Sequence, residues 1–170
     1  MRKLSAVVHF IDSLNDRLGK IFSFLIVVMM GIMMWEVVLR YVFTAPTKWA
    51  SEMTGYVYGA HFILGGAYVL LHRAHISMDA VYARLSLRVK AILDVITFPL
   101  FLFLAIILVW KGWILFSNSF ALLEHSVTMA EIPYYPFKLM IPVGGFLLLI
   151  QGLAKFTRDL TTAIRGEQVL

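Results

Sequence analysis

The 170-residue sequence contains no cysteine and few charged residues, which make up 15% of the chain. Without cysteine the chain forms no disulfide, holds no metal through thiolates and has no cysteine nucleophile. Charge is scarce because hydrophobic residues take 61% of the positions, giving a mean hydropathy of +0.84. Soluble domains are far less apolar than this, so we expect an integral membrane protein.

The sequence also lacks the short motifs that carry much enzyme chemistry. It has no GxSxG nucleophile elbow, no HExxH zinc motif and no glycine-rich phosphate loop. Four membrane spans of about 20 residues each would leave no room for a separate catalytic domain. We therefore predict that the chain is not an enzyme and holds no catalytic, cofactor-binding or metal site.

Long apolar runs, in contrast, are abundant. They predict an all-α integral membrane fold in which residues 1–170 form a single membrane domain with four transmembrane helices. The expected spans cover residues of about 21–43, 49–71, 91–116 and 137–157. Pro99 lies within the third span and is expected to bend it.

Two shorter segments combine helical apolar spacing with charged flanks. A stripe from Leu4 to Leu18 predicts an N-terminal amphipathic helix on the membrane surface. Residues 73–90 predict a short interfacial helix between spans two and three, with His75 and Asp79 on one face. A cleaved signal peptide is the competing interpretation of the N-terminus, but the next apolar run is too long and no cleavage pattern follows.

Basic residues are unevenly divided between the two sides of these spans. The N-terminal segment and the middle loop carry four each and the tail carries three, whereas the opposite side has only Arg40, Lys48, Lys111 and Lys138. The positive-inside rule then places both termini in the cytoplasm. The same bias explains the isoelectric point near 9.6 as a topology signal and an attraction to anionic membrane lipids, without nucleic acid as a partner.

Five polar or aromatic residues gather where the first span turns into the second, at the outer end of the helices: Glu36, Arg40, Lys48, Trp49 and Glu52. Glu36 and Arg40 are four apart, so they can pair on one helix face. The cluster is either a self-satisfied hairpin in which Arg40 pairs with Glu36 or Glu52, or a docking site for a larger membrane subunit, and both can hold together. Just beyond it, Gly55, Gly59 and Gly66 predict a helix-packing face.

His61 is the one ionisable residue predicted near the middle of the membrane. A proton relay or a ligand site needs partners at the same depth, and the sequence offers no convincing one. Haem ligation by two histidines is disfavoured because the other histidines fall at or outside the span boundaries. We expect His61 to pack or to form a hydrogen bond between helices.

These residues follow an order that is found in a known family. From residue 36 the chain reads Glu-Val-Val-Leu-Arg-Tyr-Val-Phe, followed by a proline, Trp49 and Glu52, and then by Gly-Gly-Ala-Tyr-Val-Leu at 65–70. His75 and Asp79 come next, and Pro142 and Gln151 lie late in the chain. This order resembles the small membrane (DctQ-like) subunit of tripartite ATP-independent periplasmic (TRAP) transporters, over nearly the whole chain.

The resemblance implies a secondary-active transporter of the inner membrane. In such a complex a periplasmic binding protein delivers a solute, often a carboxylate or sugar acid, to a large membrane subunit that holds the substrate and sodium sites and moves as an elevator. The small subunit is implied to be a fixed scaffold with no transport site of its own. A stand-alone membrane anchor or a small homo-oligomeric channel is the alternative that the residues leave open.

Overall fold

A computed structural model describes residues 2–72 and 87–165, and the regular structure of these ranges is entirely helical. The helices are α1 (Arg2–Ser23), α2 (Leu25–Tyr41), α3 (Ala50–Leu71), α5 (Leu87–Ala121) and α6 (Tyr135–Arg165). The predicted all-α fold is thereby confirmed for the described part of the chain. Residues 73–86 lie outside the described residues, and with them most of the predicted interfacial helix, including His75 and Asp79.

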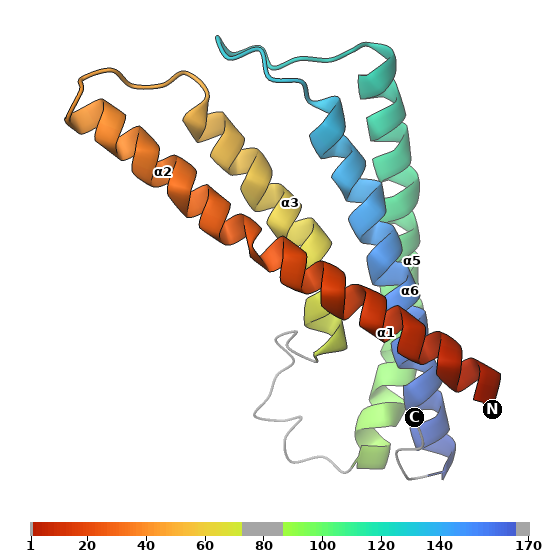
Figure 1. The fold of residues 1–170 in the computed structure, drawn as a ribbon. Helices are drawn as coiled ribbons and strands as arrows, with labels where there is room; N and C mark the ends of the chain where they lie inside the picture. Colours follow the sequence, from red (N-terminus) through yellow and green to blue (C-terminus); the bar gives the residue numbers. More distant parts are fainter. Residues whose placement is uncertain (1, 73–86, 166–170) are drawn as a thin grey trace.

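Helices α1 and α2 follow one another almost in line and form one long rod (Figure 1). The break between them falls at Phe24, whose amide donates to the Ile21 carbonyl at 3.2 Å instead of to a carbonyl four residues back. A single tightened turn of this kind interrupts the helical hydrogen-bond ladder without reversing the chain. The N-terminal helix that the sequence predicts is therefore present, but it continues directly into the first span.

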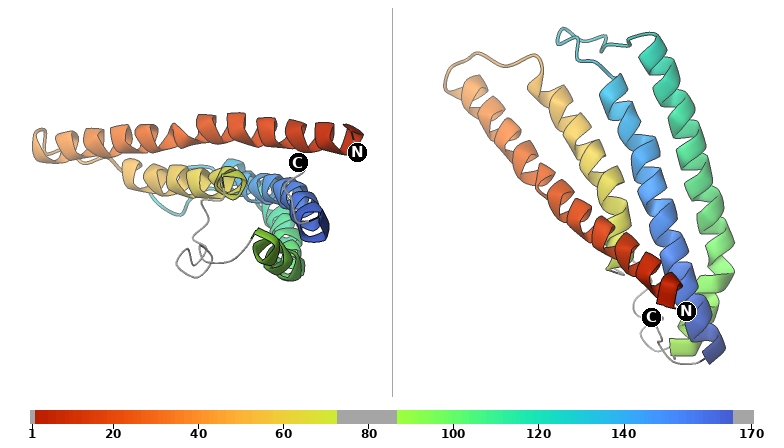
Figure 2. Two further views of the ribbon diagram at one scale, coloured as in Figure 1. Left: turned by 90° about the horizontal axis from the view of Figure 1, so that it is seen from below. Right: turned by 45° about the vertical axis from the view of Figure 1, so that its right-hand side comes forward.

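The other helices lie in layers beneath this rod. Seen from below, α1 and α2 lie on one side of α3 and α6, and α5 lies on the other side of α6 (Figure 2). Helix α3 packs against α6 and against both parts of the rod, whereas α5 packs chiefly against α6. Small side chains line the buried side of α3, since Ala50, Ala60 and Ala67 are all at most 5% exposed. Small residues let helices in a membrane approach closely.

Glycines make the closest helix contacts. A Cβ atom at Gly144 of α6 would lie 2.8 Å from the carbonyl oxygen of Ile63 in α3, so no side chain fits there. Gly19 of α1 in the same way faces the ring of Tyr68 in α3, and Gly152 of α6 faces the ring of Phe101 in α5. The packing of α1, α5 and α6 thus depends on glycines that the sequence analysis did not single out.

Three helical stretches are long and apolar enough to cross a membrane within the described ranges: Ala6–Tyr41, Arg88–Ala121 and Tyr135–Ile164. Helix α3 is not among them. Its 22 residues span about 33 Å, which suffices for a crossing, but Glu52, His61 and four glycines lower its apolar character. The second of the four predicted spans therefore stays a prediction.

Candidate functional site

The predicted cluster between the first two spans contains an ion pair with a buried carboxylate and a half-exposed guanidinium. Glu36 is only 6% exposed, and one of its carboxylate oxygens accepts from Arg40 at 3.1 Å from Nε and 2.6 Å from an Nη nitrogen. The Arg40 side chain itself is 53% exposed, so its charged end reaches out of the packed region while still touching the carboxylate. The pairing predicted from their four-residue spacing is confirmed.

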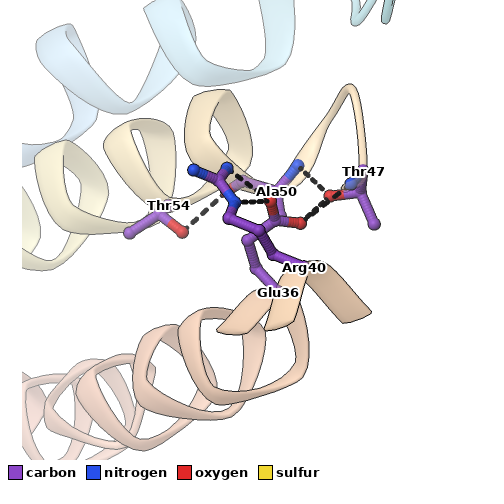
Figure 3. Close-up of polar contacts among 5 residues, drawn as sticks. All are labelled: Glu36, Arg40, Thr47, Ala50 and Thr54. Atoms are coloured by element: carbon purple, nitrogen blue, oxygen red, sulfur yellow. Dashed lines mark hydrogen bonds and ion pairs between the residues drawn. The ribbon is translucent and has the colours of Figure 1, made fainter. Parts of the chain in front are cut away.

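The second oxygen of Glu36 holds the start of α3 in place (Figure 3). It accepts from the backbone amide of Thr47 at 3.0 Å and from the Thr47 hydroxyl. The Thr47 oxygen in turn accepts from the Ala50 amide at 3.3 Å, at the first turn of α3. A hydroxyl oxygen near a helix N-terminus satisfies an amide that has no helical partner. Glu36 therefore connects the end of α2 to the start of α3.

The sequence analysis overlooked Thr47. A threonine three residues before the first helical position of α3 was the available signal, because threonine is favoured next to helix N-termini.

Removing the Glu36 carboxylate is expected to destabilise the chain more than removing the Arg40 guanidinium. Glu36→Ala leaves two Thr47 donors without their acceptor, which costs about 1.5 kcal/mol. Arg40→Ala removes a half-exposed partner, while the buried Glu36 carboxylate keeps both Thr47 donors, so the loss should stay below about 1 kcal/mol. Unfolding of the detergent-solubilised variants in SDS titrations measures both, with the exposed Lys48→Ala as control. Equal losses for the two variants contradict the connecting role of Glu36.

The remaining members of the predicted cluster lie apart from this pair. Lys48 and Trp49 are exposed, Trp49 to 40%. Glu52 does not reach Arg40 but turns toward the chain that joins α5 to α6, where it accepts from the Thr128 hydroxyl at 2.5 Å and from the Tyr56 hydroxyl. Three of the five residues therefore take part in two separate polar contacts, that of Glu36 and Arg40 within the α2–α3 hairpin and that of Glu52 between α3 and the α5–α6 loop.

The α5–α6 loop, residues 122–134, has a fixed shape. The Ser126 amide donates to Ile132 at 2.8 Å and the Tyr134 amide to Glu124 at 2.9 Å, so the two halves of the loop pair with each other. At its tip Val127 is 99% exposed and Met129 81% exposed. The loop therefore presents two exposed apolar side chains on a backbone that its own hydrogen bonds hold in place.

The loop is also fixed to α6 by an ion pair between Glu124 and Lys138, with 2.5 Å between the atoms. Donation from Lys138 holds the pKa of Glu124 below its usual value of 4.5. A carboxylate with a lowered pKa stabilises the folded state above its usual pKa and loses that effect as pH falls through its folded value. We expect the loop amides to stay protected from hydrogen exchange down to about pH 4.5 and to lose protection below it.

This pH dependence is checked by hydrogen exchange, corrected for the intrinsic rates. Glu124→Gln should lower the protection at neutral pH and make its change with pH smaller, leaving the part due to Glu52, whose carboxylate accepts from Thr128 of the same loop. Protection that falls as far in this variant as in the native chain assigns the effect to Glu52 or another group.

The three glycines of the predicted packing face differ in their surroundings. A Cβ atom at Gly66 would lie 3.2 Å from Leu148 of α6, so this glycine packs within the chain. A Cβ atom at Gly55 or Gly59 would meet no atom of another helix within 4 Å. Their stretch of α3 is therefore open to another helix, and their contact with one stays a prediction.

His61 forms the hydrogen bond between helices that the sequence predicts. Its Nδ1 lies 3.0 Å from the carbonyl oxygen of Phe22, just before the break between α1 and α2. Because a carbonyl only accepts, Nδ1 carries the proton. His61 thus holds the α1–α2 rod against α3 next to the break at Phe24.

A second polar cluster, which the sequence analysis did not assemble, joins α1 to α6. Asn15 donates to the Gln151 side-chain oxygen at 2.7 Å, and Gln151 donates to Asp12 at 3.0 Å. Asp12 also pairs with Arg158 at 2.5 Å. Asn15 and Gln151 are 2% and 1% exposed. One polar edge of the N-terminal helix therefore packs against α6, and the predicted position of this helix on the membrane surface stays a prediction.

Nearby, Lys155 of α6 bridges Asp94 of α5 at 2.8 Å and Asp159 at 3.1 Å. In the described ranges, no three His, Asp or Glu side chains gather in a way that could hold a metal ion. The polar groups around Gln151 and those around Lys155 hold one helix against another, which is the usual way that buried polar groups are satisfied in a membrane.

A comparison with known protein families finds a match over most of the chain. The sequence model of a family described as "Tripartite ATP-independent periplasmic transporters, DctQ component" matches residues 29–162. No curated protein matches the chain closely enough to count as a relative. The matched region runs from α2 into the last turns of α6, so it contains the contacts of Glu36 and Glu52 and the α6 members of the second polar cluster, but not its α1 members Asp12 and Asn15.

Proposed function

Because the chain belongs to the DctQ family of TRAP transporter components, a transporter family and not an enzyme family, we propose that it is the scaffold subunit of a binding-protein-dependent secondary transporter. The large membrane subunit of that complex carries the substrate and sodium sites. The imported solute is a small organic acid, a carboxylate or a sugar acid. No substrate site is assigned to the chain itself.

The observation that carries this proposal is how the polar groups between the helices are used. Glu36, His61, Gln151 and Lys155 each bind another helix or the linker leading to it, at distances of 2.7–3.0 Å. A transport site needs polar groups that are free to exchange a hydrated ligand, whereas a scaffold needs groups that fix its helices. The arrangement of these groups supports a rigid subunit.

Two surfaces of the chain are suited to contact partner proteins. Gly55 and Gly59 leave one stretch of α3 open to a helix of the large subunit. The tip of the 122–134 loop, with Val127 and Met129 exposed, fits a contact outside the membrane with the solute-binding protein.

The proposal includes a topology. Helix α3 is the second of four spans, and both termini lie on the cytoplasmic side of the inner membrane, as the distribution of basic residues indicates. The 122–134 loop then faces the periplasm, where the binding protein docks. The same side holds the predicted cluster of Glu36, Arg40, Lys48, Trp49 and Glu52. Cysteines introduced singly at Val127 and at Ala6 test this placement, because a membrane-impermeant thiol reagent should label intact spheroplasts only at the first position.

The scaffold role predicts that the chain binds the large subunit but transports no solute by itself. Purified with its natural partners, the chain should co-elute with one large membrane subunit, and uptake driven by sodium into liposomes should require both. Proteoliposomes with the chain alone should show no uptake. If the chain alone accumulates solute, or elutes only as a homo-oligomer from native membranes, the scaffold proposal is wrong and the channel or anchor alternative holds.

A further inference from the structure

A groove of about 770 Å³ runs along the contact between α5 and α6. Its α5 wall extends from Phe101 to Asn118, and α6 contributes Ile141 and Leu148. Lys111 and Asn118 are its polar residues, and the rest of the lining is apolar. Both polar residues lie toward the C-terminal end of α5, so the groove has one apolar end and one polar end.

The part of the groove on one side of Lys111 has the length of one half of a bilayer. From Phe101 to Lys111 the helix advances ten residues, which is about 15 Å. The hydrocarbon core of a bilayer is about 30 Å thick, so one leaflet contributes about 15 Å. An acyl chain can therefore lie along this part, and beyond Lys111 the lining continues through Ile114 and Leu115 to Asn118.

The surroundings of Lys111 place this cation near the boundary of the membrane. Its Nζ lies 5.4 Å from the centre of the Trp110 ring, and Trp110 and Trp113 are 62% and 56% exposed. Exposed tryptophans in a membrane helix favour the level of the lipid headgroups, and a lysine there extends its amine toward them. Among the described carboxylates none forms an ion pair with Lys111, so its charge can be matched from outside the chain.

We propose that this groove binds one acyl chain of an anionic phospholipid whose phosphate lies at Lys111 and Asn118. An acyl chain is apolar like most of the lining, and the amine at the mouth complements a negative headgroup. The chain thereby carries a structural lipid against the α5–α6 pair.

Photolabelling of the full-length chain in nanodiscs tests this proposal. The discs contain phosphatidylcholine and a small fraction of phosphatidylglycerol with a photoactivatable group in its acyl chain, and labelled residues are identified by mass spectrometry. Label should concentrate on groove residues of α5 and α6. Lys111→Gln should reduce it about five-fold, the effect of one lysine on an anionic lipid, whereas Lys48→Gln, an exposed lysine outside the groove, should leave it unchanged.

A second pair of variants tests the groove itself without a change of charge. Leu104→Trp fills the groove and should lower labelling at least as much as Lys111→Gln. Phe103→Trp places the same side chain on an adjacent exposed position outside the lining and should not.

Three results overturn the proposal. Label spread evenly around α5 means ordinary boundary lipid. Equal labelling of the groove by a phosphatidylcholine probe removes the role of the anionic headgroup. Cross-links from groove residues to another membrane subunit, in place of lipid, in the complex purified with its natural partners assign the groove to protein contact.

Discussion

Replacing Gly144 with valine should separate α3 from α6 and destabilise the chain by about 3 kcal/mol. Even the first atom of a side chain at this position would lie 2.8 Å from the Ile63 carbonyl oxygen and 3.0 Å from its carbonyl carbon. Both are backbone atoms, which cannot turn away as the end of a long side chain can. Unfolding of the purified chain in SDS titrations measures the loss.

Gly59→Val provides the matched control. The same substitution is made in another helix, so the change in helix propensity is similar, but Gly59 faces open space within the chain. The isolated Gly59 variant should lose less than about 0.5 kcal/mol. In the proposed complex it should instead weaken co-purification with the large subunit. Equal destabilisation of the two isolated variants contradicts the close approach of α6 to α3.

The difference between Gly144 and Gly59 also shows what could and could not be predicted from the sequence. A small-xxx-small pattern identifies positions where close approach is possible, and Gly55 and Gly59 were chosen on that basis. Which glycine is pressed against a neighbour depends on how the helices are rotated about their axes. That rotation is set by the whole interface, so Gly19, Gly144 and Gly152 could not be distinguished beforehand from glycines that are merely tolerated.

Contacts within one helix or across one short turn were easier to predict. Glu36 and Arg40 are four residues apart, and the geometry of a helix alone brings them together. A hydrogen bond from His61 to another helix was predicted, but its partner Phe22 was not, because the sequence does not indicate the break at Phe24. The partner of Glu52 could not be predicted either, because Thr128 lies 76 residues away along the chain.

The same limit explains the missed cluster between α1 and α6. Asp12 and Asn15 are on one face of α1, and Gln151 and Arg158 are on one face of α6, but nothing in either segment indicates that the two faces meet. The residues of α1 looked like the polar flank of a surface helix. Their burial follows from the direct continuation of α1 into α2, which carries α1 across α6 (Figure 1).

Replacing Gln151 with leucine should therefore destabilise the chain by about 2 kcal/mol, although leucine suits a membrane helix better than glutamine does. The substitution removes the acceptor of Asn15 and one donor to Asp12, and Asn15 is 2% exposed with its own side-chain oxygen already unpartnered. A buried polar group that loses its partner costs about 1–3 kcal/mol.

A double-mutant cycle shows whether the loss comes from this contact. Asn15→Leu alone should also destabilise, but the double variant should lose about 1 kcal/mol less than the sum, because both partners of the bond are gone and two apolar side chains meet instead. Thr97→Val is the control, since the Thr97 hydroxyl donates only within its own helix, to the Leu93 and Asp94 carbonyls. If the two losses simply add, the hydrogen bond between Asn15 and Gln151 does not stabilise the chain, and apolar packing alone holds the α1–α2 rod against α6.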